Sequence, residues 1–256
     1  MRIVLFTVDE LEFVPELNKR LLETYGGSIV AAYVSKSLFS MRSNLKKMSF
    51  FFRNLYPFCI RFSDLLRFSR WKFRLMRRGV DGHRNVPEFL ISKGINASYI
   101  ETINSKEFRD ELRELNADIF LFSPFDKIAG PKFLEIPNLG AFNVHLGKLP
   151  EYRGGLSAFW VLRFGDREAG STLHRVVPEI DAGEIIVESR IPVKTSSMHE
   201  LMSDTVQASS NMIIEGIKKI EGGGETIENS SEDGGYYFYP KLEDFREFYK
   251  KGNRLM

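Results

Sequence analysis

Three side chains in the second half of the chain are of the types that acyl transfer requires. Asn143 and His145 lie two residues apart at the end of the apolar run 141–144, and Asp181 follows in a turn between two strand-like segments. Side chains at i and i+2 of a strand point to one face, so the amide and the imidazole can share a cavity. An amide can stabilise an oxyanion, and an imidazole beside a carboxylate can move protons. These residue types predict acyl transfer that needs no covalent nucleophile.

Each of these residues also has a purely structural interpretation. An Asn before a turn commonly satisfies nearby backbone groups, and an Asp before Ala-Gly is by default a turn residue. A single His in a loop rich in Gly and Pro is more often a surface or structural residue. The chemical interpretation therefore depends on the order of the three residues and on the motifs around them.

Those motifs resemble the active site of the 10-formyltetrahydrofolate-dependent formyltransferases, from Asp118 to Glu188. The matching segments are Asn-Val-His at 143–145, Leu-Pro-Glu-Tyr-Arg-Gly at 149–154, Gly-Asp-Arg-Glu-Ala-Gly-Ser-Thr at 165–172 and Asp-Ala-Gly at 181–183. The chain departs from the family at one point. Many members have Pro-Ser after the His, where this chain has Leu146 and Gly147.

The resemblance implies a formyl donor, N10-formyltetrahydrofolate, and a role for each residue. Asn143 would donate a hydrogen bond to the oxyanion, His145 would stabilise it and transfer a proton, and Asp181 would orient His145 or a water and act as a base. The implied folate contacts are Phe125, Asp126, Lys127, Ile128, Glu179 and Ile180. The expected acceptor contacts are Arg153, Asp9 and Glu10, although a solvated turn equally explains the two acids. His174 either borders the site or fills the core.

The sequence favours one acceptor among those that the family uses. Glycinamide ribonucleotide enzymes carry a Gly-rich phosphate loop after the first strand, where this chain has the acidic segment 7–12. Methionyl-tRNA formyltransferases carry an RNA-binding barrel after the catalytic domain. The residues after the long helix, which ends at the glycines 222–224, are too few for one. Elimination favours the sugar N-formyltransferases and a nucleotide-linked amino sugar. The alternatives are a tRNA formyltransferase without the barrel and an inert module that binds nucleic acid or a membrane.

Alternating strand and helix patterns predict an open, doubly wound and mostly parallel α/β sheet. Ligands in such sheets sit at the carboxyl ends of strands, where Asn143 and His145 fall. The expected strands are 2–7, 28–34, 97–102 and 117–122, and the expected helices are 13–25, 86–93 and 106–115, the last with a capping box from Asn104 and Glu107.

The second half of the chain adds antiparallel strands and a long helix. Strands are expected at 171–177 and 185–192, on either side of Asp181, after a short helix at 158–164. Ser197 and Glu200 form a capping pair that opens a helix ending at the glycines 222–224. We expect a catalytic domain at 1–225 and a C-terminal extension at 226–256, with an aromatic strand and a helix. The aromatic strand would pair two subunits or close a sheet edge.

Composition indicates a water-soluble cytoplasmic protein without structural metal. The chain has 256 residues, of which 43% are hydrophobic and 27% charged, and no apolar run is long enough to span a bilayer. It opens directly on a strand pattern rather than on a signal peptide. One Cys and four scattered His give neither a disulfide framework nor a metal-ligand spacing.

The basic charge is concentrated in one segment, residues 36–78, within an expected helical insertion at 35–80. The segment holds twelve Lys and Arg side chains and a single acid, Asp64, although the whole chain has a net charge of only +2. A basic amphipathic helix can lie on an anionic membrane, hold tRNA phosphates or grip a nucleotide diphosphate. A solvated helical hairpin against the sheet edge is the structural alternative. Our hypothesis is a contact with the phosphates of a nucleotide- or lipid-linked amino sugar.

Overall fold

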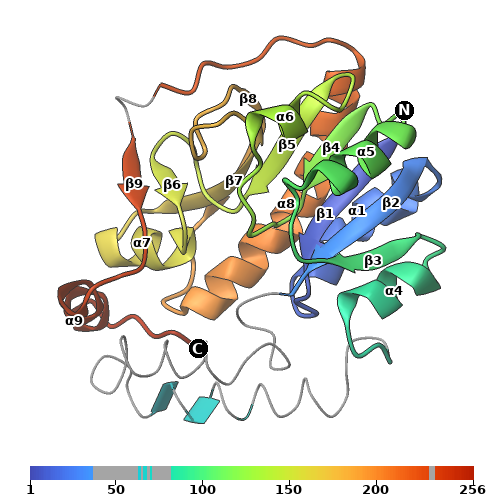
Figure 1. The fold of residues 1–256 in the computed structure, drawn as a ribbon. Coiled ribbons are helices and arrows are strands. Elements are labelled where there is room, and N and C mark those ends of the chain that lie inside the picture. Colours follow the sequence, from blue (N-terminus) through green and yellow to red (C-terminus); the bar gives the residue numbers. More distant parts are fainter. Residues whose placement is uncertain (37–62, 65, 68–69, 71–81, 231–233) are drawn as a thin grey trace.

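The computed structural model describes residues 1–36, 63–64, 66–67, 70, 82–230 and 234–256. Within these ranges a seven-stranded sheet has the order β3-β2-β1-β4-β5-β7-β8 (Figure 1). The five strands from β3 to β5 run parallel, and β7 and β8 run antiparallel to their neighbours. The predicted doubly wound, mostly parallel α/β fold is confirmed. The strands of this sheet are β1 (Ile3–Val8), β2 (Ile29–Ser35), β3 (Ala97–Ile100), β4 (Ile119–Phe122), β5 (Gly140–His145), β7 (Glu168–Arg175) and β8 (Ile185–Pro192).

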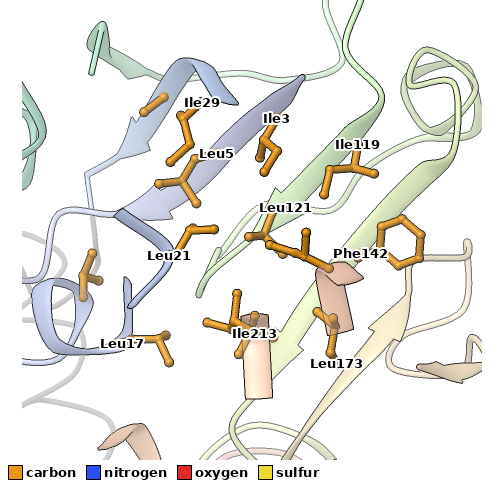
Figure 2. Packing of buried hydrophobic residues seen from close by; sticks show 14 of the residues in the cluster. Ile3, Leu5, Leu17, Leu21, Ile29, Ile119, Leu121, Phe142, Leu173 and Ile213 are labelled. Atoms are coloured by element: carbon orange, nitrogen blue, oxygen red, sulfur yellow. The ribbon is translucent and has the colours of Figure 1, made fainter. Parts of the chain in front are cut away.

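One face of the sheet is covered by α1 (Val14–Tyr25), α4 (Val86–Ser92) and α8 (Met198–Glu221). Their apolar stripes meet the inward side chains of the strands, so that Leu17 and Leu21 of α1 and Ile213 of α8 lie in one buried cluster (Figure 2). A 3₁₀ turn, Gly26–Ser28, links α1 to β2. Helical spacing in the sequence was enough to predict all three helices, because each buries one stripe against the sheet.

The other face carries α5 (Lys106–Glu114) and α6 (Pro131–Leu134) over a second buried cluster rich in phenylalanine. Phe6 contacts several other rings there, among them Phe122, Phe125 and Phe133. Ala141 of β5 belongs to this cluster as well. Asn143 and His145, the polar residues of β5 in the candidate site, lie on the same face of the sheet as Ala141.

A third buried cluster joins the C-terminal residues to the middle of the chain. Here α7 (Ser157–Phe164) packs against α9 (Leu242–Lys250), with the rings of Phe159 and Phe248 stacked at 4.6 Å. A two-stranded parallel sheet pairs β6 (Tyr152–Gly154) with β9 (Gly235–Tyr237). Segment 234–256 is thereby fixed beside the Leu-Pro-Glu-Tyr-Arg-Gly loop.

Several local expectations are corrected or fall outside the described residues. The cap of α5 is Ser105, whose hydroxyl accepts from Phe108 N, while Asn104 bonds the backbone of Ile128 and Gly130. The sequence did not predict β6 or α6, which are only three and four residues long. The cap predicted at Ser197 is confirmed, since its hydroxyl accepts from Glu200 N.

Most of the basic segment lies outside the described residues, so its expected helix and partners stay predictions. Asp64, its single acid, is described and buried, and it accepts hydrogen bonds from Tyr249 Oη and Leu255 N. No helix in the described part of the chain is long and apolar enough to cross a membrane.

Candidate active site

Strand β5 sends alternate side chains to opposite faces of the sheet. Phe142 and Val144 enter the cluster under α1 and α8, whereas Ala141 enters the cluster on the other face. Asn143 and His145 share the face of Ala141, as the period of two requires. The expectation that both point into one space therefore agrees with the geometry of the strand.

His174 of β7 completes a polar row with Asn143. The two residues are direct partners in the antiparallel pairing of β5 and β7, and Asn143 Nδ2 lies 3.1 Å from His174 Nε2. His174 Nδ1 lies 2.9 Å from the carbonyl oxygen of Arg175, which can only accept, so Nδ1 carries the proton and Nε2 accepts from Asn143. An amide nitrogen has two protons, and one of them is left for an oxygen of a ligand. Of the two interpretations given for His174, contact with the candidate site is the one that the structure supports.

The Asp181 turn folds back over the sheet to reach both histidines. Asp181 Oδ2 lies 3.6 Å from His145 Nδ1, and Oδ1 lies 3.4 Å from His174 Nε2. Gly154 N donates to Oδ2 at 2.9 Å. Asp181 has φ +51°, in the left-handed region that Asp adopts more readily than most residues. A Cβ on Gly183 would collide with the carbonyl oxygen of Arg175, so the close return of the turn requires glycine there.

The electrostatics of the cluster keep the carboxylate charged and the imidazole neutral. Burial by itself raises the pKa of Asp181, but the nearby rings of His174 and His145 and the Gly154 N–H together lower it to about 2. Burial lowers the pKa of His145; Asp181 opposes this shift and His174 adds to it. At neutral pH the cluster therefore holds an ionised Asp181 next to an unprotonated site on His145.

The hydrogen bonds of His145 identify which nitrogen is available. Nε2 lies 2.6 Å from the carbonyl oxygen of Tyr152, so the neutral ring carries its proton there. Nδ1, on the side of Asp181, is then free of a proton and can accept one. The imidazolium formed in this way would face a carbonyl on one side and a carboxylate on the other, and both stabilise it.

Gly147 makes room for a hydroxyl from a different part of the chain. A Cβ at this position would collide with Ser157 Oγ and with His145 Nε2. Ser157 is the first residue of α7 and is buried. The departure at 147 thus has a physical reason, because the space beside His145 Nε2 that a side chain at 147 would need is filled by Ser157.

Arg153 is buried, and its guanidinium bonds to Asn229 rather than to a carboxylate. Nη2 lies 3.0 Å from Asn229 O and 3.1 Å from Asn229 Oδ1, and Nε has no partner among the described residues. The loop that carries Arg153 also supplies Tyr152 O and Gly154 N to the cluster. Its predicted contact with an acceptor stays a prediction.

The predicted folate residues lie on two segments, 125–128 after β4 and 179–180 before Asp181. Phe125 stacks on Phe122, and Asp126 accepts a hydrogen bond from the hydroxyl of Ser35. Ile128 is 71% exposed, and with Lys127 it borders a hollow of about 470 Å³ whose other side is formed by residues 101–105. None of the three proposed catalytic residues lines this hollow. Glu179 and Ile180 are exposed next to Asp181.

Asp9 and Glu10 do not join the cluster; their carboxylates bond to nearby groups of the fold. Asp9 accepts from Val86 N at 2.9 Å and from Tyr99 Oη at 2.8 Å. Glu10 accepts from the backbone N–H groups of Glu12 and Phe13. Asp9 thus accepts from the first residue of α4, and Glu10 accepts from the residues just before α1.

Asn229 is a site residue that the sequence did not reveal. It lies after α8, and its amide donates to the carbonyls of Asp181 and Gly183. An Asn in a polar stretch beyond a helix gives no periodicity or motif that would have distinguished it. Among the described residues, no group of three His, Cys, Asp or Glu is arranged to hold a metal ion.

Known proteins resemble this chain in sequence over its central part. Residues 83–217 match the formyl transferase family. The methionyl-tRNA formyltransferase of Thermotoga neapolitana is 33% identical over 132 residues, which are 51% of this chain and 42% of that protein. That of Prochlorococcus marinus is 26% identical over 186 residues, which are 70% of this chain and 54% of the relative. The matched region thus spans about half the length of these curated relatives.

Solved structures resemble the fold over most of the chain. An N-formyltransferase from Helicobacter canadensis, in complex with folinic acid and dTDP-3-aminofucose, has a TM-score of 0.59 at 16% identity and covers 96% of this chain and 79% of its own. Glycinamide ribonucleotide transformylase 1 from Symbiobacterium toebii has a TM-score of 0.60 at 14% identity, with 87% and 89% covered. At such identities the likeness concerns the fold. The sequence match covers more than half of the residues and includes all three proposed catalytic positions, so the chain belongs to the formyl transferase family.

Proposed function

We propose that this protein transfers a formyl group from N10-formyltetrahydrofolate to an amine, most favourably the amine of a nucleotide-linked amino sugar. One observation carries the proposal. Asn143, His145 and Asp181 come from β5 and from a distant turn, yet their polar atoms meet in one partly buried cluster.

Each residue has a step that its geometry allows. The free N–H of Asn143 would donate to the formyl oxygen as this oxygen gains negative charge. Nδ1 of His145 would accept the proton that the attacking amine loses and return it to N10 of the folate as the bond between that nitrogen and the formyl carbon breaks. Asp181, with a pKa of about 2, stays ionised and would stabilise the imidazolium instead of removing the proton itself.

Exposed residues on two loops support the proposed folate donor. Ile128, Glu179 and Ile180 are exposed on the loops that the family resemblance assigns to folate, so a flat ring could cover them. The carboxylate of Asp126 already bonds Ser35, which favours recognition by the backbone of this loop. The solved relative with folinic acid has the same fold.

Two observations favour an amino-sugar acceptor. The loop after β1 has no glycine, and its two acids bond to local groups, so it supplies no site for the phosphate of glycinamide ribonucleotide. Solved relatives of the fold include sugar N-formyltransferases, one of them holding a nucleotide-linked aminofucose. The basic segment 36–78 adds positive charge suited to a nucleotide diphosphate.

A methionyl-tRNA acceptor is the second candidate, because the curated relatives with 33% and 34% identity over the central region are methionyl-tRNA formyltransferases. The basic segment suits tRNA phosphates as well. A tRNA contact of several phosphates would give binding that weakens steeply with salt.

Formyl transfer from 10-formyltetrahydrofolate to a panel of nucleotide-linked amino sugars, methionyl-tRNA and small amines tests both candidates. We expect turnover with an amino sugar and its loss in His145→Gln. Turnover with methionyl-tRNA alone would show that methionyl-tRNA, and not an amino sugar, is the acceptor. Full activity of His145→Gln would reject the mechanism. No transfer to any of them would reject the proposed function.

A further inference from the structure

The segment after α8 contacts the catalytic turn through one buried amide. Asn229 Nδ2 donates to the carbonyl oxygens of Asp181 and Gly183, each at 2.9 Å, and the residue is only 8% exposed. One of these carbonyls belongs to the left-handed Asp181 and the other to Gly183, two residues later. A single side chain therefore binds two carbonyls of the turn that carries the proposed catalytic carboxylate.

Arg153 holds Asn229 from the other side. Its Nη2 donates to both the backbone oxygen and Oδ1 of Asn229, which fixes the orientation of the amide so that Nδ2 faces the turn. The next residue of the same loop, Gly154, donates its N–H to the Asp181 carboxylate. The loop, the turn and the segment after α8 are thus joined by hydrogen bonds that close a ring.

The segment that carries Asn229 is itself anchored. Ile227 and Ile185 exchange two backbone hydrogen bonds, at 2.8 and 2.9 Å, at the start of β8. Beyond Asn229 the chain returns as β9, which pairs with β6 around Arg153. The segment that carries the Asn229 amide is therefore anchored on both sides along the chain. Such anchoring is needed if Asn229 is to hold the Asp181 turn in place.

Asp181 needs such support because its conformation is unfavourable for a residue with a side chain. A left-handed non-glycine residue persists only when its surroundings determine it, and it relaxes if they do not. Its carboxylate must lie between His145 Nδ1 and His174 Nε2, where displacement of about 1 Å costs about 10²-fold in rate.

We infer that Asn229 is a positioning residue for the reaction: with Arg153 it holds the Asp181 turn so that the carboxylate faces both histidines. This inference rests on the proposed function and extends it, because it makes residues beyond the family match part of the catalytic apparatus. Asn229 touches no reacting atom and acts through Asp181.

Asn229→Asp is the sharpest variant, because it keeps the shape and the acceptor for Arg153 but removes both N–H donors to the turn. We expect kcat to fall about 10²-fold, as for a misplaced catalytic group. The KM for the folate donor and the KM for the amine acceptor should change little. Asn229→Ala, which introduces no charge, should behave alike. The matched control is Asn253→Asp. Asn253 is another buried C-terminal Asn, and its amide donates to the carbonyl oxygen of Leu162 in α7. Loss of this amide should leave kcat unchanged.

Histidine NMR separates this inference from the proposed function, since it requires no substrate. The chain has four histidines. In both Asn229 variants the ring signals of His145 and His174 should change, while those of His83 and His199 should not. Unchanged signals of His145 and His174, or an equal loss of kcat in Asn253→Asp, would overturn the positioning role. Changed signals in a protein without formyl transfer would reject the proposed function and leave the structural link between Asn229 and the turn in place.

Discussion

Two histidine–carboxylate pairs in this protein have opposite electrostatics. His145 faces Asp181 at 3.6 Å inside the candidate site, and His199 faces Glu12 at 2.6 Å between the starts of α8 and α1. The pKa of His145 is lowered by burial, whereas the pKa of His199 is raised by its hydrogen bond to Glu12. A neighbouring carboxylate therefore does not by itself decide whether a histidine is charged.

The difference lies in what surrounds each ring. His145 is almost fully buried and has a second histidine nearby, so its charged form loses hydration. The His199 side chain is about a quarter exposed and forms a short, direct bond with its acid. The first pair is suited to accept a proton during a reaction, and the second is suited to hold two helices together.

The largest expected effect is a difference in turnover between variants of the two acids, Asp181 and Glu12. Asp181→Asn should lower kcat/KM for formyl transfer by about 10³-fold, because the imidazolium of His145 loses its counter-charge. Glu12→Gln should change the free energy of unfolding by at most about 1 kcal/mol and leave turnover intact. Steady-state kinetics and urea unfolding of both variants make the comparison. Similar losses of turnover in the two variants would show that the pairs are not functionally distinct.

Gly147 tests whether the surroundings of His145 are as tightly fitted as the geometry indicates. Gly147→Ser should lower kcat by about 10²-fold, because the new side chain displaces His145 or Ser157. Gly147→Ser combined with Ser157→Gly vacates the contested space and should recover most of the loss. Kinetics of the single and double variants form a double-mutant cycle, and additive losses would contradict a shared space. The titration of His199 should be the same in all of them.

Stability should depend on pH with opposite sign at the two histidines. The folded-state pKa of His145 lies below its ordinary value of 6.5, so the unfolded chain binds the proton first and stability falls as pH drops below 6.5. The pKa of His199 is raised, so its contribution is fully present below 6.5 and is lost as pH rises through the folded-state pKa. Urea unfolding between about pH 5 and 8 should show weaker acid destabilisation in His145→Gln and stronger acid destabilisation in His199→Gln. The same dependence of stability on pH in His145→Gln and His199→Gln would show that the two histidines do not differ in this way.

The smallest expected effect concerns an acid that the sequence assigned to the acceptor. Asp9→Ala removes the acceptor of Val86 N and Tyr99 Oη and should cost about 1 kcal/mol of stability. The KM of the acceptor should stay the same, because the carboxylate is already occupied within the fold. A higher KM at unchanged stability would support the assignment made from sequence.

Much of the fold could be predicted because its elements follow strong local patterns. The helical spacing of Leu17 and Leu21 and the buried run of β4 each contain enough residues to define a period. Short elements such as β6 contain too few residues for any period, and they form only because β9 lies beside them. The cap of α5 was misplaced by one residue, since Asn104 and Ser105 are both good caps and only the fold directs Asn104 to the loop 128–130.

The candidate site divides in the same way. Asn143 and His145 could be placed on one face from strand alternation alone, and their motif with Asp181 identified the family. The family resemblance suggested that Asp181 orients His145, but the sequence did not indicate that the same carboxylate also meets His174, because this depends on how the left-handed turn folds back over the sheet. The link from Asn229 was invisible for the same reason.

The sequence by itself therefore determined the residue types, their order and the alternating elements, since these depend on local periodicity and on motif. Only the tertiary structure decided that Asp181 meets His174 as well as His145, which nitrogen of His145 is free of a proton, and why position 147 is glycine. Those properties depend on burial and on distances of a few ångströms between segments far apart in the chain, and local sequence patterns do not encode such distances.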